Sequence, residues 1–257
     1  MHITIDIILM LSCVALLAGF IDALAGGGGL LTIPAMMAAG IPPVAALATN
    51  KLQGTFGTGS AFLAFARKGH IDFRRFLWPA LAAFVGAVAG AFVVQRVDPH
   101  FLTALVPILL IVMALYFLLA PPMADMDRHA RLGAAGIAAV SAGIGFYDGF
   151  FGPGTGSFLT TAFVALGGLG LLRAIAHAKF LNFMTNVAAL AAMIAGGKVL
   201  WMLGLPMAVA NIIGNQIGAH TAMRFGGRGI RPLIVIMAIL LAIKLLLDPT
   251  NPLRQMF

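Results

Sequence analysis

The sequence predicts an all-α, polytopic membrane protein with two inverted-topology repeats, each made of a Gly-broken hairpin helix plus three spanning helices. Hydrophobic residues make up 61% of the 257 residues and charged residues only 9%, whereas a soluble domain carries about 25% charged residues. The apolar segments are long, and they recur from one end of the chain to the other. Because so few charges cannot cover a water-facing surface, the soluble classes are excluded.

Ten apolar segments follow one another, and their lengths predict which of them cross the membrane. A span needs about 20 residues, so segment 29–39 is too short to cross alone. Residues 3–39 as one helix would be about 55 Å long at about 1.5 Å per residue, which favours a broken hairpin. We expect the first segment to be retained, because it has no basic region and apolar sequence runs past any cleavage point. The expected segments are 3–24, 29–39, 44–66, 76–95, 101–120, 131–150, 156–171, 174–196, 200–222 and 230–247.

An internal repeat divides the chain at its most polar connector, 121–131, into a first half (1–122) and a second half (123–257). Motifs and single glycines of one half recur in the other in the same order, as a duplicated unit requires. We expect the matched mid-helix glycines to permit close packing of helices. The aligned positions are 19–28 with 145–154, 46–51 with 174–179, Gly86 with Gly214, and Gly90 with Gly218.

The basic residues predict that the two halves have opposite orientations. If loop 67–75 is cytoplasmic, ten of the sixteen Lys and Arg residues lie at cytoplasmic ends and three lie outside, as the positive-inside rule requires. Connector 121–131 is then cytoplasmic, and both termini are periplasmic. The net charge of +8 therefore reflects topology, and no nucleic-acid partner is expected, because the basic residues form no continuous face.

Two glycine-rich breaks fall at equivalent places in the halves, at 26–29 and 152–156. Broken helices in corresponding positions of inverted halves point to a substrate site near the membrane midplane. Each half-helix then begins inside the membrane, where its N–H groups and partial positive charge can bind an anion. The alternative is that these glycines only permit tight helix crossing. The candidate binding residues in the breaks are Gly27, Gly28, Gly29, Gly154, Thr155, Gly156 and Ser157.

Lys51 and Lys179 occupy equivalent positions near the start of two apolar segments. A charge inside a membrane is costly, which makes both lysines candidate anion ligands. The alternative is that their ammonium groups reach the lipid headgroups. On a helix, Lys179 shares one face with Asn182 and Asn186, so we expect Lys179 to hold the anion more strongly than Lys51.

Further polar residues lie near these lysines or on a later helix. Those near Lys51 are candidate ligands of the same anion, while the amides of the later helix either complete the site or bridge helices. The candidates beside Lys51 are Asn50, Gln53 and Thr58, and those on the later helix are Gln216, Asn211 and Asn215.

Asp22 and Asp148 each precede a break by four residues. They could pair with a lysine, cap the unwound segment or carry a proton, and capping is the role that we favour over proton coupling. His177, near Arg173, is a proton-relay candidate, with a packed polar residue as the alternative. No catalytic residue, metal site or cofactor is predicted, because the chain has no Glu, a single cysteine (Cys13) and no two histidines at helical spacing. An enzyme is therefore not expected.

Four motifs carry a family resemblance. They are Gly-Phe-Ile-Asp-Ala-Leu-Ala-Gly-Gly-Gly-Gly-Leu-Leu-Thr-Ile-Pro (19–34), Ala-Thr-Asn-Lys-Leu (48–52), Gly-Phe-Tyr-Asp-Gly-Phe-Phe-Gly-Pro-Gly-Thr-Gly-Ser (145–157) and Lys-Phe-Leu-Asn-Phe (179–183). In order and spacing they resemble the TauE/SafE sulfite exporter family over nearly the whole chain. The resemblance implies a permease of the bacterial inner membrane for sulfite, sulfoacetate or other organosulfonates, aromatic ones included. Members of the family both export and take up their substrates, and these motifs do not separate the two directions.

The residues and the resemblance together predict a secondary transporter with alternating access around a midplane anion site. Its expected partners are a small sulfur-containing anion and the lipid bilayer. A permease for another small anion, such as a carboxylate, and an anion channel are the alternatives. The coupling ion (a proton, another ion or none) and the oligomeric state, a homodimer included, are left open.

Overall fold

The computed structural model describes residues 4–119 and 129–225, and within these ranges the chain is helical, without a strand. The helices there agree closely with the expected segments. The expected segment 230–247, most of connector 121–131 and the C-terminus lie outside the described residues. The helices are α1 (Ile5–Ala25), α2 (Gly29–Ala38), α3 (Pro43–Arg67), α4 (Phe73–Val94), α5 (Pro99–Leu119), α6 (Ala134–Phe150), α7 (Thr155–Ala165), α8 (Leu171–Ala195) and α9 (Trp201–Phe225).

Both predicted hairpins are confirmed, and both break at glycines. In the first half, Gly26 ends α1 with a φ of 72°. In the second half, Gly152 and Gly154 separate α6 from α7 with φ values of 99° and 83°. Because only glycine readily adopts a positive φ, the chain leaves the helix at these points. With 10 and 11 residues, α2 and α7 are too short to cross a bilayer.

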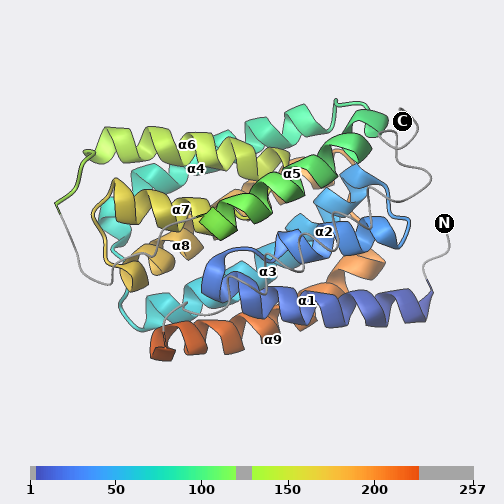
Figure 1. Cartoon of the computed structure of the whole chain (residues 1–257), viewed down its shortest axis with the longest axis horizontal. Helices are drawn as coiled ribbons and strands as arrows, with labels where there is room; N and C mark the ends of the chain where they lie inside the picture. Colours follow the sequence, from blue (N-terminus) through green and yellow to red (C-terminus); the bar gives the residue numbers. More distant parts are fainter. Residues whose placement is uncertain (1–3, 120–128, 226–257) are drawn as a thin grey trace.

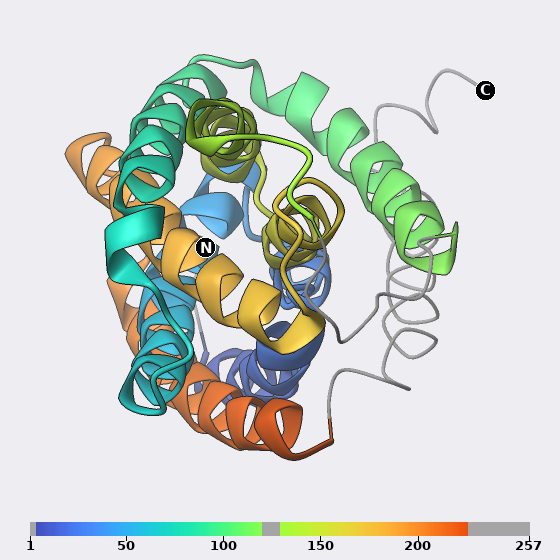
Figure 2. The same cartoon turned by 90° about the vertical axis from the view of Figure 1, so that its left-hand side faces the viewer.

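The two halves interlock, because the first helix of each half packs against the fourth helix of the other. Helix α1 lies along α9, and α6 lies along α4 (Figure 1). Figure 2 shows the same bundle from one end, with helices of both halves intermixed. A Cβ on Gly90 would collide with the backbone of Phe146, and one on Gly214 with that of Leu16. The packing role predicted for these mid-helix glycines is confirmed.

Corresponding helices of the two halves run in opposite directions across the molecule. In Figure 1, α1 runs from right to left and α6 from left to right, and α9 and α4 are likewise opposed. These are the directions that inverted repeats require. The orientation of each half with respect to a membrane stays a prediction.

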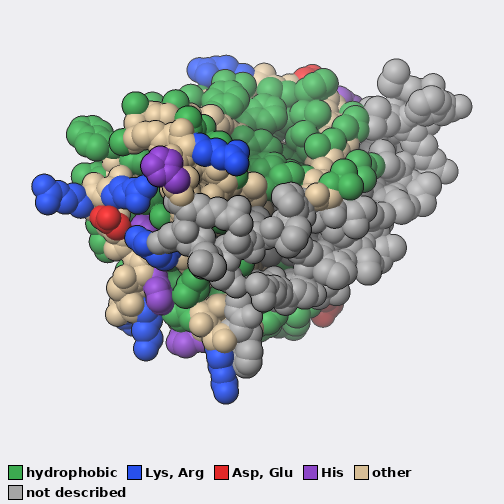
Figure 3. All heavy atoms as spheres, turned by 60° about the vertical axis from the view of Figure 1, so that its left-hand side comes forward, with side chains coloured by type: hydrophobic (Ala, Val, Ile, Leu, Met, Phe, Trp, Pro, Cys, Tyr) green, Lys and Arg blue, Asp and Glu red, His purple; other side chains and the backbone are tan. Residues whose placement is uncertain are grey.

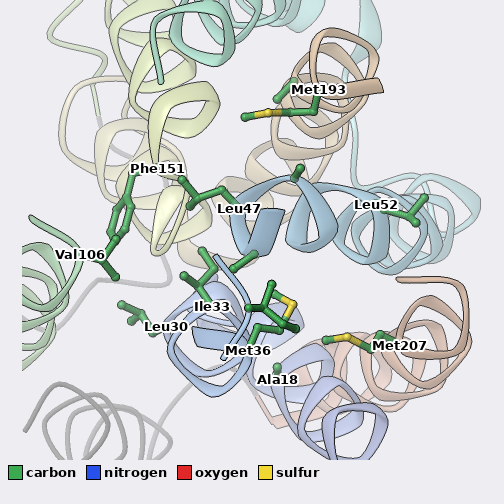
Figure 4. Close-up of a cluster of buried hydrophobic side chains, with 14 of the residues drawn as sticks. Ala18, Leu30, Ile33, Met36, Leu47, Leu52, Val106, Phe151, Met193 and Met207 are labelled. Carbon is green, nitrogen blue, oxygen red and sulfur yellow. The ribbon is translucent and has the colours of Figure 1, made fainter. Parts of the chain in front are cut away.

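Helix α2 is enclosed by apolar side chains. Leu30, Ile33 and Met36 of α2 are fully buried, and Figure 4 shows them in a cluster with Leu47 of α3 and Val106 of α5. An interrupted helix is tolerated at membrane depth only where protein surrounds it. The apolar side chains of α2 therefore hold the broken backbone in the interior of the bundle.

The outer surface carries large exposed apolar side chains, as lipid contact requires. Trp78 is 71% exposed and Met202 is 79% exposed. Among the described residues, three helices are long and apolar enough to cross a membrane: Ile5–Leu24 of α1, Phe73–Val94 and Leu171–Ala195. The chain is thus a membrane protein with several apolar helices.

Basic side chains gather at one end of the bundle, the left-hand end in Figure 1, and Figure 3 shows part of this group. Two hydrogen bonds hold the connections of this end together. The Asp72 N–H donates to Nε2 of His177 at 2.9 Å, and the Arg131 N–H donates to the Leu166 carbonyl at 2.9 Å. The basic residues at the helix ends and loops joined here are Arg67, Lys68, Arg74, Arg75, Arg131, Arg173 and Arg224.

Candidate functional site

A small polar cavity of about 30 Å³ lies between the two glycine breaks. A water molecule needs about 10–15 Å³ of such space, so the cavity has room for about two. Helices from both halves contribute to its wall, and the lining is mostly polar. It is lined by Asp22, Gly26, Gly28, Gly29, Asn50, Lys51, Gln53, Gly54, Thr58, Asp148, Gly152, Gly154, Asn182, Asn186 and Asn211.

The two breaks touch each other beside this cavity. A Cβ on Gly26 would collide with the backbone of Gly156, and one on Gly29 would lie 3.3 Å from the Cα of Pro153. Side chains at these positions would separate the breaks. The absence of side chains therefore brings the first residues of α2 and α7 to one point. Several N–H groups there already donate to carbonyls of the breaks: Leu30 to Gly27, Leu31 to Gly28, and Ser157 to Gly154.

Lys51 of the first half forms a buried ion pair with Asp148 of the second half. The Lys51 Nζ lies 2.7 Å from Asp148 Oδ1, and each side chain is only 2% exposed. The Thr155 hydroxyl, at the start of α7, lies 2.7 Å from the same carboxylate oxygen. A Cβ on Gly152 would lie 2.7 Å from the Lys51 Nζ, so glycine at this position leaves room for the lysine.

Lys179 and Asp22 form the corresponding pair, with the halves exchanged. The Lys179 Nζ lies 2.8 Å from Asp22 Oδ2 and also donates to the Asp22 backbone carbonyl. The other carboxylate oxygen, Oδ1, accepts from the Gly28 N–H at 3.4 Å, at the start of α2. Each lysine therefore neutralises the aspartate that precedes the break of the other half. Asp22 also caps the half-helix of its own half.

Amide side chains complete the polar wall of the cavity. On α3, Asn50 Oδ1 accepts from the Thr32 hydroxyl at 2.6 Å and from the Gln53 amide at 2.7 Å. On α8, the Asn186 amide donates to Asn182 Oδ1 at 3.0 Å and reaches the Thr58 hydroxyl of α3 at 3.5 Å. This network fixes the amide orientations on both sides of the cavity.

Some of the predicted site residues lie away from the cavity lining. Gln216 donates to the Ser60 carbonyl at 2.8 Å and so bridges α9 to α3. His177 accepts from the Asp72 N–H and packs its ring 4.0 Å from that of Phe76, at the basic end of the bundle. The remaining candidates outside the lining are Gly27, Thr155, Gly156, Ser157, Lys179 and Asn215.

The lining also contains residues beyond the predicted ligand set. Gly26 and Gly152 belong to the breaks and are equivalent in the repeat, so the alignment of 19–28 with 145–154 already contained the signal for both. Gly54 lies one helical turn from Lys51, and a Cβ there would lie 3.4 Å from Asn186 Oδ1. Asn211 lines the cavity from α9 and also donates to the Ala15 carbonyl at 3.0 Å. It therefore serves both of the roles left open for it.

Comparison with known proteins identifies relatives along almost the full length of the chain. A probable membrane transporter protein, ORF9, of a Sinorhizobium species is 52% identical over 93% of this chain and 92% of its own length. The probable membrane transporter protein YfcA of Escherichia coli K12 is 47% identical over 91% and 88%. A probable membrane transporter protein of Haemophilus influenzae is 43% identical over 96% and 98%. No solved structure matches the chain.

The family comparison agrees with the motifs and with the broken helices. Residues 11–245 match the family described as Sulfite exporter TauE/SafE. The match extends across both hairpins, both buried ion pairs and the whole cavity lining. The chain therefore belongs to the TauE/SafE family of membrane transporters.

Proposed function

We propose that this protein is a secondary transporter that carries a small sulfur-containing anion, such as sulfite, sulfoacetate or another organosulfonate, across the bacterial inner membrane. The observation that supports this most directly is the position of the cavity. It lies where two half-helices begin, one from each half, and Lys51 borders it. Helix N-termini and an ammonium group are both donors that bind anions.

The donors around the cavity suit an anion with several acceptor oxygens. Lys51 offers three N–H donors, one of which points at Asp148, and the Asn182 amide group offers two more. Gly29 and Gly156 carry backbone N–H groups at the starts of α2 and α7. A sulfonate or sulfite group presents three oxygens within a small radius. The sulfur chemistry itself is inferred from membership in the TauE/SafE family.

Lys51, rather than Lys179, is the lysine that we assign to direct contact with the anion. Lys51 borders the cavity, whereas Lys179 lies behind Asp22 and is held by two oxygens of that residue. The sequence predicts the opposite, namely that Lys179 holds the anion more strongly than Lys51 because Asn182 and Asn186 share its helix face. In the proposed site, Lys179 positions Asp22 and the start of α2.

The small size of the cavity favours a carrier over an open channel. A cavity of about 30 Å³ has room for about two water molecules, and a sulfonate group with its carbon substituent is larger than that. The proposed site must therefore widen when the anion enters. A site that opens, closes and lies between two inverted halves is the arrangement that alternating access needs.

A thermal-shift screen of the purified protein in detergent tests the substrate class. The probes are sulfite, sulfoacetate, methanesulfonate, toluenesulfonate, taurine and acetate. We expect sulfite, sulfoacetate, methanesulfonate and toluenesulfonate to raise the unfolding temperature in a concentration-dependent way, because ligands that bind only the folded state stabilise it. Taurine is the matched probe for net charge, since it carries an ammonium group beside the same sulfonate.

Uptake of the stabilising anion into proteoliposomes then separates binding from transport. We expect uptake to saturate with concentration, as for a carrier. Stabilisation by acetate alone would replace the sulfonate assignment with a carboxylate permease. Flux that rises linearly with concentration would replace the carrier with a channel.

A further inference from the structure

The two buried ion pairs are equivalent in the repeat but differ in how their carboxylates are held. Both oxygens of Asp22 have partners: Lys179 at Oδ2 and the Gly28 N–H at Oδ1. Both partners of Asp148 lie at the same oxygen, Oδ1, which Lys51 and the Thr155 hydroxyl approach at 2.7 Å. Asp148 Oδ2 is buried and has no hydrogen-bond partner among residues 4–119 and 129–225.

The pairs also differ in their access to the cavity. Lys51 and Asp148 both line it, so a bound anion can reach the Lys51 ammonium group directly. Of the other pair, only Asp22 lines the cavity. An anion in the cavity can therefore compete with Asp148 for its lysine, whereas it cannot reach the lysine of Asp22.

Charge balance constrains this competition between the anion and Asp148. The four buried charges, two lysines and two aspartates, sum to zero in the described structure. A monovalent anion at Lys51 would leave the site with one uncompensated negative charge, and an unpaired buried charge is strongly unfavourable. One proton on the carboxylate released from Lys51 restores neutrality.

We propose that Asp148 is the proton carrier of this transporter, and that one proton binds to it each time an anion replaces it at Lys51. This inference rests on the proposed function, because it requires an anion at Lys51. In the binding step, the contact between Lys51 and Asp148 breaks, the contact between Lys51 and the anion forms, and the Asp148 carboxylate becomes a carboxylic acid. Release of the anion on the other side reverses all three changes, so a monovalent anion and a proton cross together without net charge.

The other titratable groups near Asp148 are engaged elsewhere. Tyr147, beside it on α6, donates to the Pro153 carbonyl at 2.5 Å. His177 on α8 contacts the Asp72 N–H and the Arg173 carbonyl. Arg74 and Arg75, on the neighbouring α4, lie in its first turn, at the basic end of the bundle. Within residues 4–119 and 129–225, the charged groups that line the cavity with Asp148 are therefore Lys51 from α3 and Asp22 from α1.

Isothermal titration of the wild-type protein with methanesulfonate tests the proposal without any substitution. Methanesulfonate stays ionised in the accessible pH range, so any proton uptake belongs to the protein. Titrations in buffers of different ionisation enthalpy report the protons bound per anion. We expect uptake approaching one proton, and an affinity that rises as the pH falls, by up to about tenfold per pH unit.

Asp148→Asn assigns the proton to a residue, and its control is the charge-neutral double variant Lys179→Met with Asp22→Asn. We expect Asp148→Asn to bind methanesulfonate without proton uptake and with an affinity independent of pH, because the amide leaves Lys51 charged and cannot ionise. The double variant removes one positive and one negative charge, so it should still take up one proton per anion, whatever its affinity. In proteoliposomes containing a pH dye, an inward methanesulfonate gradient should acidify the lumen with the double variant and leave its pH unchanged with Asp148→Asn.

The outcomes separate this proposal from the proposed function. Wild-type binding without proton uptake would overturn the proton proposal and leave the anion site intact. Proton uptake that persists in Asp148→Asn, or that disappears in the double variant Lys179→Met with Asp22→Asn, would also overturn it. No binding of methanesulfonate to the wild-type protein would refute the sulfonate site, and the proton proposal with it.

Discussion

At the scale of single residues, the central feature is that each buried lysine is neutralised by an aspartate from the other half. Lys51 and Asp148 are each 1% exposed, so bulk water reaches neither charge. A buried pair of this kind contributes little net stability, but removing one member leaves a buried charge unpaired. The pair therefore makes the two halves depend on each other.

Lys51→Met tests this dependence through stability. We expect the substitution to lower the free energy of unfolding by about 3–5 kcal/mol, because Asp148 loses its buried partner and must stay unpaired or take up a proton. The double substitution Lys51→Met with Asp148→Asn should recover most of that loss. Denaturant unfolding in detergent measures both, and a single variant as stable as the wild type would show that the ion pair is not buried in solution.

The sequence identified the residues of this pair but not the pairing itself. The repeat marked Lys51, Lys179, Asp22 and Asp148 as equivalent, and their burial in a membrane protein implied partners. The exchange between halves depends on contacts between residues separated by 97 and 157 positions. No local pattern reports such contacts, because they depend on how the helices of the two halves are placed, with Lys51 of α3 against Asp148 of α6 and Lys179 of α8 against Asp22 of α1. The same reason explains why the sequence leaves open whether Gln216 completes the cavity or, as in the structure, bridges α9 to α3.

At the scale of secondary-structure elements, the two short helices α2 and α7 determine where the site can form. Their lengths and start points were predictable, because glycine clusters at 26–29 and 152–156 interrupt apolar runs too long for one span. Their mutual contact was not predictable, since the meeting of Gly26 with Gly156 requires the relative placement of both hairpins.

Leucine substitutions in the breaks test the role of the half-helices. We expect Gly28→Leu and Gly154→Leu to abolish anion transport while the protein still inserts into the membrane. A Cβ on Gly28 would lie 2.7 Å from the Ala18 carbonyl oxygen, and Gly154 has a φ of 83°, which disfavours any side chain. Uptake assays in proteoliposomes, normalised to protein content, measure the effect.

Gly143→Leu is the control for these substitutions. Gly143 lies on α6, and a Cβ there would meet no atom within 4 Å. We expect this variant to transport like the wild type. Wild-type transport by Gly28→Leu or Gly154→Leu would show that the breaks are only packing features.

At the scale of the whole molecule, the distribution of basic residues and the directions of the helices give one consistent topology. Basic residues gather at one end of the bundle, where α3 and α9 end and α4, α6 and α8 begin. The positive-inside rule places this end in the cytoplasm. The opposite end then faces the periplasm, with the start of α1 and the loop between α4 and α5.

Cysteine labelling in cells tests this topology in a Cys13→Ser background. We expect Thr4→Cys and Asp98→Cys to react with a membrane-impermeant maleimide added from the periplasmic side. His70→Cys, in the loop between α3 and α4, should react only after the membrane is permeabilised. The reverse labelling pattern would invert the molecule, and equal labelling of all three sites would contradict a single orientation.

The central claim is that one anion binds at Lys51, where the two halves meet. Its most direct test is the affinity for methanesulfonate of two charge-neutral double variants, Lys51→Met with Asp148→Asn and, as the matched control, Lys179→Met with Asp22→Asn. Because a charge-assisted hydrogen bond contributes about 1.5–3 kcal/mol, we predict that the first variant binds about ten- to a hundredfold more weakly than the wild type. The control should lose much less, and a Lys51→Met with Asp148→Asn variant that binds as tightly as the wild type would contradict the account.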